Sequence, residues 1–135
     1  MTILALDIGE KRCGIAVSDA SEKIAIPIST LSTAEVMQNA PAFRRIIEDH
    51  EPRLLICGLP VSLNGNENKQ AVRIRGQAEQ IAERNGLPLE FVDERMSSSE
   101  ARRILHESGH SERSMRGKVD MIAASLILET YLESQ

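Results

Sequence analysis

The sequence contains very few aromatic side chains. Its 135 residues include two phenylalanines, one tyrosine and no tryptophan. Proteins that bind single-stranded nucleic acid by stacking its bases need several aromatic rings, so base stacking cannot be the main binding mode of this chain. Any nucleic acid would have to be held through its phosphate backbone.

Cysteine and long apolar runs are also scarce. The two cysteines, Cys13 and Cys57, each lie within an apolar run, which predicts buried reduced thiols rather than a disulfide or a catalytic thiol. No apolar run approaches the ~20 residues that a membrane-spanning helix needs. The N-terminal residues lack the basic flank and apolar core of a signal peptide, so we expect a cytoplasmic protein with no membrane partner.

An excess of positive charge is missing as well. The formal net charge of −4 argues against a protein that coats nucleic acid non-specifically. The charge is unevenly distributed, because residues 95–118 hold six basic and three acidic side chains, a net +3, which leaves −7 on the rest. The length, with 41% hydrophobic and 27% charged residues, predicts one globular domain over residues 1–135.

Three predicted strands open the chain. The apolar pattern places them at residues 2–8, 13–18 and 24–31. The short turn between the first two predicts an antiparallel hairpin. Pro27 cannot donate to a sheet ladder, so the third strand is expected at an edge.

Helices and strands alternate in the remainder. In chain order we predict a helix over 34–51, a strand over 53–57, a helix over 69–85, a strand over 88–93, a short helix over 97–107, a loop over 108–117 and a helix over 118–133. Right-handed crossovers place the fourth and fifth strands parallel to the first. The predicted fold class is therefore α/β, with a five-stranded mixed sheet in the order 3-2-1-4-5 flanked by helices.

Local signals refine three of these elements. Pro41 either breaks the first helix or begins its second half, with Asn39 or Ala40 as the cap. Gly58-Leu59-Pro60 predicts a turn after the fourth strand, where the backbone could approach a phosphate. The predicted buried stripe of the last helix consists of Val119, Ile122, Ala123, Leu126, Ile127 and Tyr131.

Acidic residues stand at the ends of three apolar elements. Asp7 ends the first strand, Asp93-Glu94 ends the fifth, and Asp120 opens the last helix. Ligand sites in open sheets lie at the carboxyl ends of the strands beside the topological switch, where these acids would meet. Carboxylates gathered there would repel one another unless a cation lay between them, and hard oxygen ligands favour Mg²⁺ or Mn²⁺. The candidate catalytic and metal-binding residues are therefore Asp7, Asp93, Glu94 and Asp120.

Plainer interpretations exist for each acid. Asp7 could simply end a hairpin strand, and the same strand-turn-strand also opens the actin-like and sugar-kinase ATP-binding folds, although those sites use two copies of the fold. Asp120 could complement the helix dipole. Adjacent strand residues point to opposite faces, so we expect only one of Asp93 and Glu94 to be a ligand.

Basic side chains accompany these acids. Solvated surface charge is the plain interpretation of Lys11 and Arg12 at the hairpin tip, but both are placed to touch a phosphate. A basic stretch flanked by Glu94 and Asp120 would put further cations beside the proposed ions. The candidate phosphate contacts are Lys11, Arg12, Arg95, Arg113, Arg116 and Lys118.

Several motifs, taken in order, resemble the YqgF family. They are Asp7-x-Gly with Gly14-x-Ala16-x-Ser18, Gly58-Leu59-Pro60, Asp93-Glu94-Arg95-x-Ser97, Glu100-Ala101-Arg102, and Lys118-Val119-Asp120 with Ala124, Ile127-Leu128-Glu129 and Tyr131. The match runs nearly end to end; Cys13, and Ser98 where threonine is expected, are harmless variations. Members of this family are named as Holliday junction resolvases or pre-16S ribosomal RNA nucleases. The resemblance implies a ribonuclease H-like fold, a bacterial cytoplasmic nuclease that matures the 5′ end of 16S ribosomal RNA, and an acidic site of Asp7, Asp93 or Glu94, and Asp120.

The leading hypothesis is metal-dependent hydrolysis of phosphodiester bonds. Two ions roughly 3.5–4 Å apart would be bridged by Asp7. Branched DNA is the alternative substrate, and a non-catalytic RNA-binding ribosome-assembly factor is the alternative from another class. Expected partners are pre-16S ribosomal RNA or branched DNA and a ribosomal particle, and we expect a monomer or a weak homodimer.

Overall fold

A computed structural model describes residues 1–60, 68–93, 107 and 118–135. The elements are β1 (Thr2–Ile8), β2 (Arg12–Ser18), β3 (Ala25–Ser32), α1 (Thr33–Met37), α2 (Pro41–His50), β4 (Pro52–Leu59), α3 (Lys69–Asn85), β5 (Leu89–Asp93) and α6 (Lys118–Glu133). The short helix predicted over 97–107 and the loop predicted over 108–117 fall outside the described residues, apart from Glu107.

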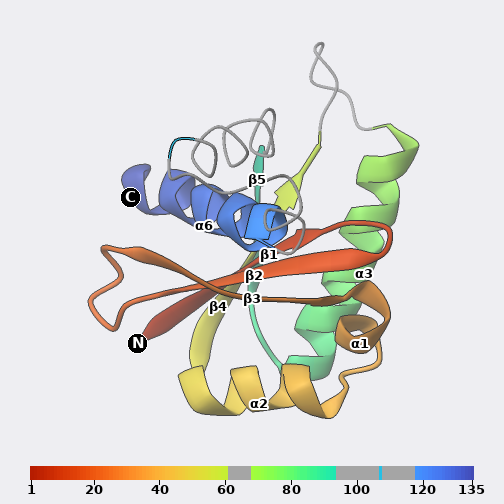
Figure 1. Cartoon of the computed structure of the whole chain (residues 1–135), viewed down its shortest axis with the longest axis horizontal. Helices are drawn as coiled ribbons and strands as arrows, with labels where there is room; N and C mark the ends of the chain where they lie inside the picture. The colour runs from red at the N-terminus through yellow and green to blue at the C-terminus, as the bar shows by residue number, and fades with distance from the viewer. Residues whose placement is uncertain (61–67, 94–106, 108–117) are drawn as a thin grey trace.

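The five strands form one sheet in the order β3-β2-β1-β4-β5, which confirms the predicted order (Figure 1). β1 is antiparallel to β2 and parallel to β4, and β4 is parallel to β5. β3, which contains Pro27, lies at one edge as expected. The topological switch therefore lies between β1 and β4, so the end of β1 is a favourable position for a ligand site.

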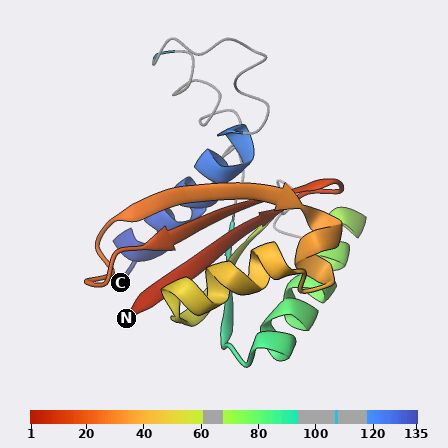
Figure 2. The same ribbon diagram turned by 60° about the horizontal axis from the view of Figure 1, so that its bottom comes forward.

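Helices cover both faces of the sheet. Figure 2 shows α6 on one side of the strands and α2 and α3 on the other. Alternate residues of β1 supply the two cores: Leu4 and Leu6 pack on the α3 side, and Ile3 and Ala5 pack on the α6 side. Because side chains alternate along a strand, Asp7 lies on the α6 side.

α3 follows its predicted pattern closely. The Asn68 side chain caps its first turn by accepting a hydrogen bond of 2.9 Å from the Ala71 amide. Its predicted apolar stripe is buried throughout: Ala71, Ile74, Ala78, Ile81 and Ala82. Gly86 ends the helix with φ of 66°, a left-handed conformation that costs glycine little.

Pro41 begins a second helix rather than kinking a single one. α1 ends at Met37, and Pro41 is the first residue of α2 with Ala40 at the cap position. The missing amide of proline is no loss in a first helical turn, because that amide would have no partner within the helix. The second of the two predicted alternatives is thus confirmed.

One predicted boundary and part of one predicted buried face differ from the structure. β4 continues through Gly58 and Leu59, where a turn was expected, because Leu59 is buried and pairs with Asp93 of β5. Four residues of the predicted stripe of α6 are buried as expected: Val119, Ala123, Ile127 and Tyr131. Ile122 and Leu126 are only partly buried, and Ala124 and Leu128, which were not predicted, are fully buried. Apolar residues surround much of this helix, so periodicity alone could not fix its orientation. Within the described residues, no helix has the length and apolarity needed to cross a membrane.

Candidate active site

Asp7 is placed by the hairpin of β1 and β2. It stands one residue before the end of β1 and pairs directly with Gly14 of β2. Its side chain is half-buried on the side of the sheet that α6 covers. A carboxylate is therefore held at the end of the central strand, under the first turn of α6.

Asp120 reaches the same place from the other end of the chain. It lies in the first turn of α6, and its backbone presses against Gly14: a Cβ built on Gly14 would lie 1.8 Å from the Asp120 carbonyl oxygen. Gly14 thus pairs with Asp7 and also contacts Asp120. The absence of a side chain at one residue of β2 brings the first and last predicted acids together.

Arg12 faces Asp120 across this junction. Its Nε lies 2.8 Å from Asp120 Oδ2, and the two side chains are 56% and 20% exposed. The Oδ2 atom is itself buried and has no aligned hydrogen bond among the described residues, so the contact is a charge pair without good donor geometry. Buried carboxylate oxygens normally accept hydrogen bonds, and this one is available for a stronger ligand.

The hairpin tip that carries Lys11 and Arg12 is fixed by α1. The Thr33 amide donates to the Lys11 carbonyl at 2.9 Å, and the Thr33 hydroxyl donates to the Gly9 carbonyl at 2.8 Å. Thr33 is buried. Its role was not predicted from the sequence, although the capping box of Ser32 and Glu35 around it is a recognisable signal.

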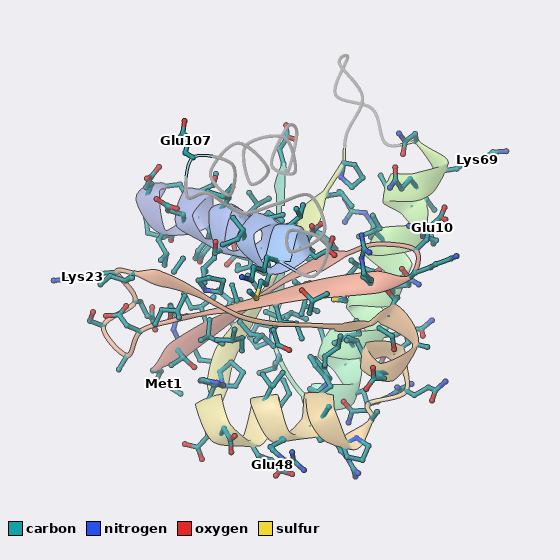
Figure 3. The ribbon with its side chains drawn as sticks, viewed as in Figure 1. Met1, Glu10, Lys23, Glu48, Lys69 and Glu107 are labelled. Carbon is teal, nitrogen blue, oxygen red and sulfur yellow. The ribbon has the colours of Figure 1, made fainter. Side chains whose placement is uncertain are left out.

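A surface pocket of about 280 Å³ lies between the tip and α6. It is lined by Gly9, Glu10, Lys11, Arg12 and Asp120. Figure 3 shows Glu10 at the tip, beside α3, where its Oε1 lies 3.5 Å from Arg73 Nη1. The basic side chains of Lys11 and Arg12 and the carboxylates of Glu10 and Asp120 therefore border a space large enough for a phosphate group.

Cys13 lies within the electrostatic influence of both acids. Burial raises the pKa of the Cys13 thiol, and the negative charges of Asp7 and Asp120 raise it further. The thiol therefore stays protonated, as the sequence predicted for a buried structural cysteine. Two carboxylates acting on one neighbour indicate a local excess of negative charge.

Asp93 does not join this pair directly. It ends β5, two strands from β1, so the two backbones are about 10 Å apart at typical strand spacing. Leu89 and Phe91, which share a face of β5 with Asp93, pack on the α3 side of the sheet. The guanidinium carbon of Arg75 lies 4.5 Å from the centre of the Phe91 ring. Within residues 1–60, 68–93, 107 and 118–135, no three acidic, histidine or cysteine side chains form a metal-binding group.

The remaining predicted site residues divide into two sets. Lys118 is the half-buried first residue of α6, two positions before Asp120. Glu94, Arg95, Arg113 and Arg116 lie outside the described residues. Their assignment to the site stays a prediction from the sequence.

Comparison with known proteins identifies what the chain resembles. A family model described as "RuvX: Holliday junction resolvase" matches residues 1–134. A protein of Cutibacterium acnes named "Putative pre-16S rRNA nuclease" is 41% identical over 131 residues, which cover 96% of this chain and 81% of that protein. A protein of the same name from Methylobacillus flagellatus is 37% identical, with 97% and 90% covered.

Solved structures share the fold at low sequence identity. Thermus thermophilus RuvC in complex with a Holliday junction substrate matches with a TM-score of 0.58 at 13% identity, covering 99% of this chain and 94% of that one. The fowlpox virus Holliday junction resolvase matches with a TM-score of 0.56 at 16% identity, with 100% of both chains covered. These likenesses confirm the expected ribonuclease H-like fold.

Proposed function

Because the chain belongs to the RuvX family of Holliday junction resolvases, the YqgF family of the sequence resemblance, we propose that it is a nuclease that hydrolyses phosphodiester bonds with the help of divalent metal ions. The observation that carries this proposal is the meeting of Asp7 and Asp120 at Gly14. No packing requirement explains two carboxylates at that point, and within residues 1–60, 68–93, 107 and 118–135 one of their oxygens is buried without a hydrogen bond.

The residues present fit a hard cation such as Mg²⁺ or Mn²⁺. The side chains of Asp7 and Asp120 offer only oxygen ligands, which these ions prefer, and no described residue gives Asp120 Oδ2 the hydrogen bond that a buried oxygen normally accepts. We assign Asp7, Asp120 and one acid at the end of β5 as the ligands of two ions. Bound there, the ions would activate the attacking water and stabilise the leaving oxygen.

Strand alternation favours Glu94 over Asp93 as the third ligand. Leu89 and Phe91 point to the α3 side, and Val92 packs on the α6 side, where Asp7 lies. Asp93 shares a face of β5 with Leu89 and Phe91. Because side chains alternate along a strand, we expect Glu94 on the same face as Val92. Asp93 would then support the site from the opposite face of the sheet.

The basic side chains would hold the phosphate backbone. Lys11 and Arg12 line the pocket beside Asp120, and Lys118 lies in the same helical turn as Asp120. Arg95, Arg113 and Arg116 would add to this surface from the neighbouring basic stretch. Although the net charge of the chain is −4, this basic surface would attract nucleic acid at the acidic site. The scarcity of aromatic residues fits recognition through the phosphate backbone.

The substrate we favour is the 5′ end of pre-16S ribosomal RNA, alone or on a ribosomal particle. The names of the relatives in Cutibacterium acnes and Methylobacillus flagellatus support this substrate. Such a role belongs to the cytoplasm and requires no more than a monomer or a weak homodimer. The description of the family model favours a second candidate, the resolution of four-way DNA junctions.

One experiment separates these functions. Purified protein is incubated with end-labelled pre-16S RNA or a four-way DNA junction, with and without Mn²⁺, and the products are sized on a sequencing gel. We expect Mn²⁺-dependent cleavage of RNA by wild type and by Asp49→Asn, an exposed control on α2, and none by Asp7→Asn. Cleavage of the junction alone would establish the second candidate. RNA binding without any cleavage would indicate a non-catalytic assembly factor.

A further inference from the structure

Arg12 and Asp120 form an ion pair, although the proposed reaction gives them different partners: a phosphate for Arg12 and a metal ion for Asp120. Arg12 Nε approaches Asp120 Oδ2 to 2.8 Å. That oxygen is buried and accepts no hydrogen bond from the part of the chain that the structure describes, and it is an atom that a bound metal ion would use. Arg12 therefore occupies, with its own charge, the position of a cation beside a proposed ligand.

Arg12 is not required to hold Asp120 in place. The Asp120 backbone is fixed by its contact with Gly14, and the flanking Val119 and Ala123 are buried. Arg12 itself begins β2 at a tip secured by Thr33, and more than half of its side chain is exposed. The long side chain can thus change direction while both backbones stay where they are.

The pair is weak enough to exchange. An exposed ion pair favours the paired over the separated side chains by less than about fivefold, because solvent screens the charges and ordering two side chains costs entropy. Nε approaches Oδ2 to 2.8 Å, but no guanidinium N–H in the described residues is aligned to form a hydrogen bond with that oxygen. A divalent cation carries twice the charge of a guanidinium and would displace it. The freed guanidinium is suited to a phosphate, to which it can donate two parallel hydrogen bonds.

We propose that Arg12 exchanges partners during the catalytic cycle: it neutralises Asp120 before the metal ion binds, and it grips a phosphate of the nucleic acid after the ion takes its place. This inference rests on the proposed function. Arg12 would then lower the affinity of the protein for the metal ion, with which it competes, and raise its affinity for the nucleic acid, which it attracts. A residue that merely supported the fold would favour the binding of both.

Lys11 provides the matched control. It lines the same pocket and carries the same charge, but it forms no ion pair with any residue in the described part of the chain. Removing the Lys11 charge changes the general field at the site without freeing Asp120. Any effect peculiar to Arg12 is then the effect of the ion pair.

The first measurement is Mn²⁺ affinity without nucleic acid, read from the electron paramagnetic resonance signal of free Mn²⁺ at fixed ionic strength. We expect Arg12→Gln to bind Mn²⁺ about threefold to fivefold more tightly than wild type, which is the range of an exposed ion pair. Lys11→Gln should change by less than about twofold. Arg12→Lys, which keeps the charge, should lie between wild type and Arg12→Gln.

The second measurement is the binding of a fluorescein-labelled pre-16S RNA fragment in Ca²⁺. Here both Arg12→Gln and Lys11→Gln should weaken binding, because each removes a phosphate contact. The inference is overturned if Arg12→Gln binds Mn²⁺ no more tightly than Lys11→Gln, or if it binds RNA as well as wild type does. If wild type itself binds no Mn²⁺, the proposed function fails and this inference fails with it.

Discussion

Gly14 and Asp120 are in direct backbone contact, although they are far apart in the sequence. A Cβ on Gly14 would lie 1.8 Å from the Asp120 carbonyl oxygen and 2.8 Å from the Met121 amide nitrogen. Real Cβ atoms do not come so close to backbone. Gly14 therefore sets the distance between the first turn of α6 and the end of β1, which carries Asp7.

Replacing Gly14 with alanine should displace the start of α6. The added methyl group meets backbone rather than a flexible side chain, so the helix must move, at a cost of about 1–3 kcal/mol in the free energy of unfolding. Because Asp120 moves with the helix, we expect cleavage to fall further than stability predicts. Urea denaturation and cleavage rates of folded Gly14→Ala measure the two effects.

Gly76 supplies the control for this prediction. It lies within α3, and a Cβ built there meets nothing within 4 Å. Alanine is favoured over glycine inside a helix by about 1 kcal/mol. Gly76→Ala should therefore stabilise the protein and leave cleavage unchanged. If Gly14→Ala matched Gly76→Ala in both respects, the contact with Asp120 would not matter.

Asp7→Asn should have opposite effects with and without metal. Its charge and that of Asp120 act on the same neighbour, Cys13, so removing one of them relieves repulsion and should raise the melting temperature of the metal-free protein. Cleavage should fall at least about 100-fold, equivalent to ~2.7 kcal/mol in the activation free energy. Mn²⁺ should raise the melting temperature of wild type but not that of Asp7→Asn.

Thermal melts with and without Mn²⁺ test this prediction, and Asp49→Asn on α2 serves as the control for loss of a carboxylate elsewhere. That variant should keep the full Mn²⁺ shift and full cleavage. Near-wild-type cleavage by Asp7→Asn would end the proposal that Asp7 binds the ions.

Asp93 and Glu94 should be unequal in cleavage. Alternation along β5 sets Asp93 with Leu89 and Phe91, on the side away from Asp7. We expect Glu94→Gln to cleave at least ~10-fold more slowly than Asp93→Asn, a difference of about 1.4 kcal/mol in the barrier. Single-turnover rates at saturating Mn²⁺ provide the comparison. Equal and complete loss in both variants would contradict a single ligand at this strand end.

Asp19 should contribute to stability in a pH-dependent way and play no part in catalysis. It follows β2 and accepts hydrogen bonds from the Ser21 hydroxyl and from the amides of Lys23 and Ile24. These bonds, the Ser21 hydroxyl first, lower its pKa from 3.8 to about 2. Because the folded pKa is the lower one, the stabilisation is complete above pH ~4 and disappears as the pH falls to about 2.

Urea denaturation of wild type and Asp19→Asn at several pH values tests this assignment. Wild type should be the more stable protein at pH 5, and the difference should shrink to nothing near pH 2, while cleavage at neutral pH stays the same. A stability difference that did not vary between pH 5 and pH 2 would show that the carboxylate charge is irrelevant.

The sequence predicted the fold well because its elements are strongly patterned. The alternation in β1, the stripe of α3 with its Gly86 stop, and the crossover rule together gave the strand order. The buried face of α6 was predicted only in part, because a helix that is apolar on most sides does not reveal fully which side faces the sheet. The close contact of its first turn with Gly14 is visible only in three dimensions.

The sequence was sufficient to propose the acids of the candidate site, two of which the structure places at Gly14, but not to predict the contacts around them. Asp7 and Asp120 stood out because a carboxylate at the end of an apolar element has no packing role. The ion pair of Arg12 with Asp120 and the clamp of Thr33 on the hairpin tip link residues distant in sequence. Such contacts depend on the register and on the path of a turn, and neither leaves a periodic signal.

The basic stretch from 95 to 118 should contribute to affinity through salt-sensitive contacts. Arg113 and Arg116 would each neutralise a phosphate and release a counterion, so removing one of them should reduce the slope of log affinity against log salt by roughly 0.7–0.9. Binding of labelled pre-16S RNA by Arg113→Ala and Arg116→Ala is measured across a salt series in Ca²⁺, which suppresses cleavage.

Arg44 distinguishes a local contact from a general loss of charge. It is exposed on α2, on the face of the sheet opposite to α6 (Figure 2). Arg44→Ala removes the same charge and should leave the slope nearly unchanged, because a charge beyond the Debye length of about 10 Å at 0.1 M salt is largely screened. If Arg113→Ala and Arg116→Ala behaved like Arg44→Ala, the basic stretch would not touch the substrate. The phosphate grip would then be assigned to Lys11, Arg12 and Arg95.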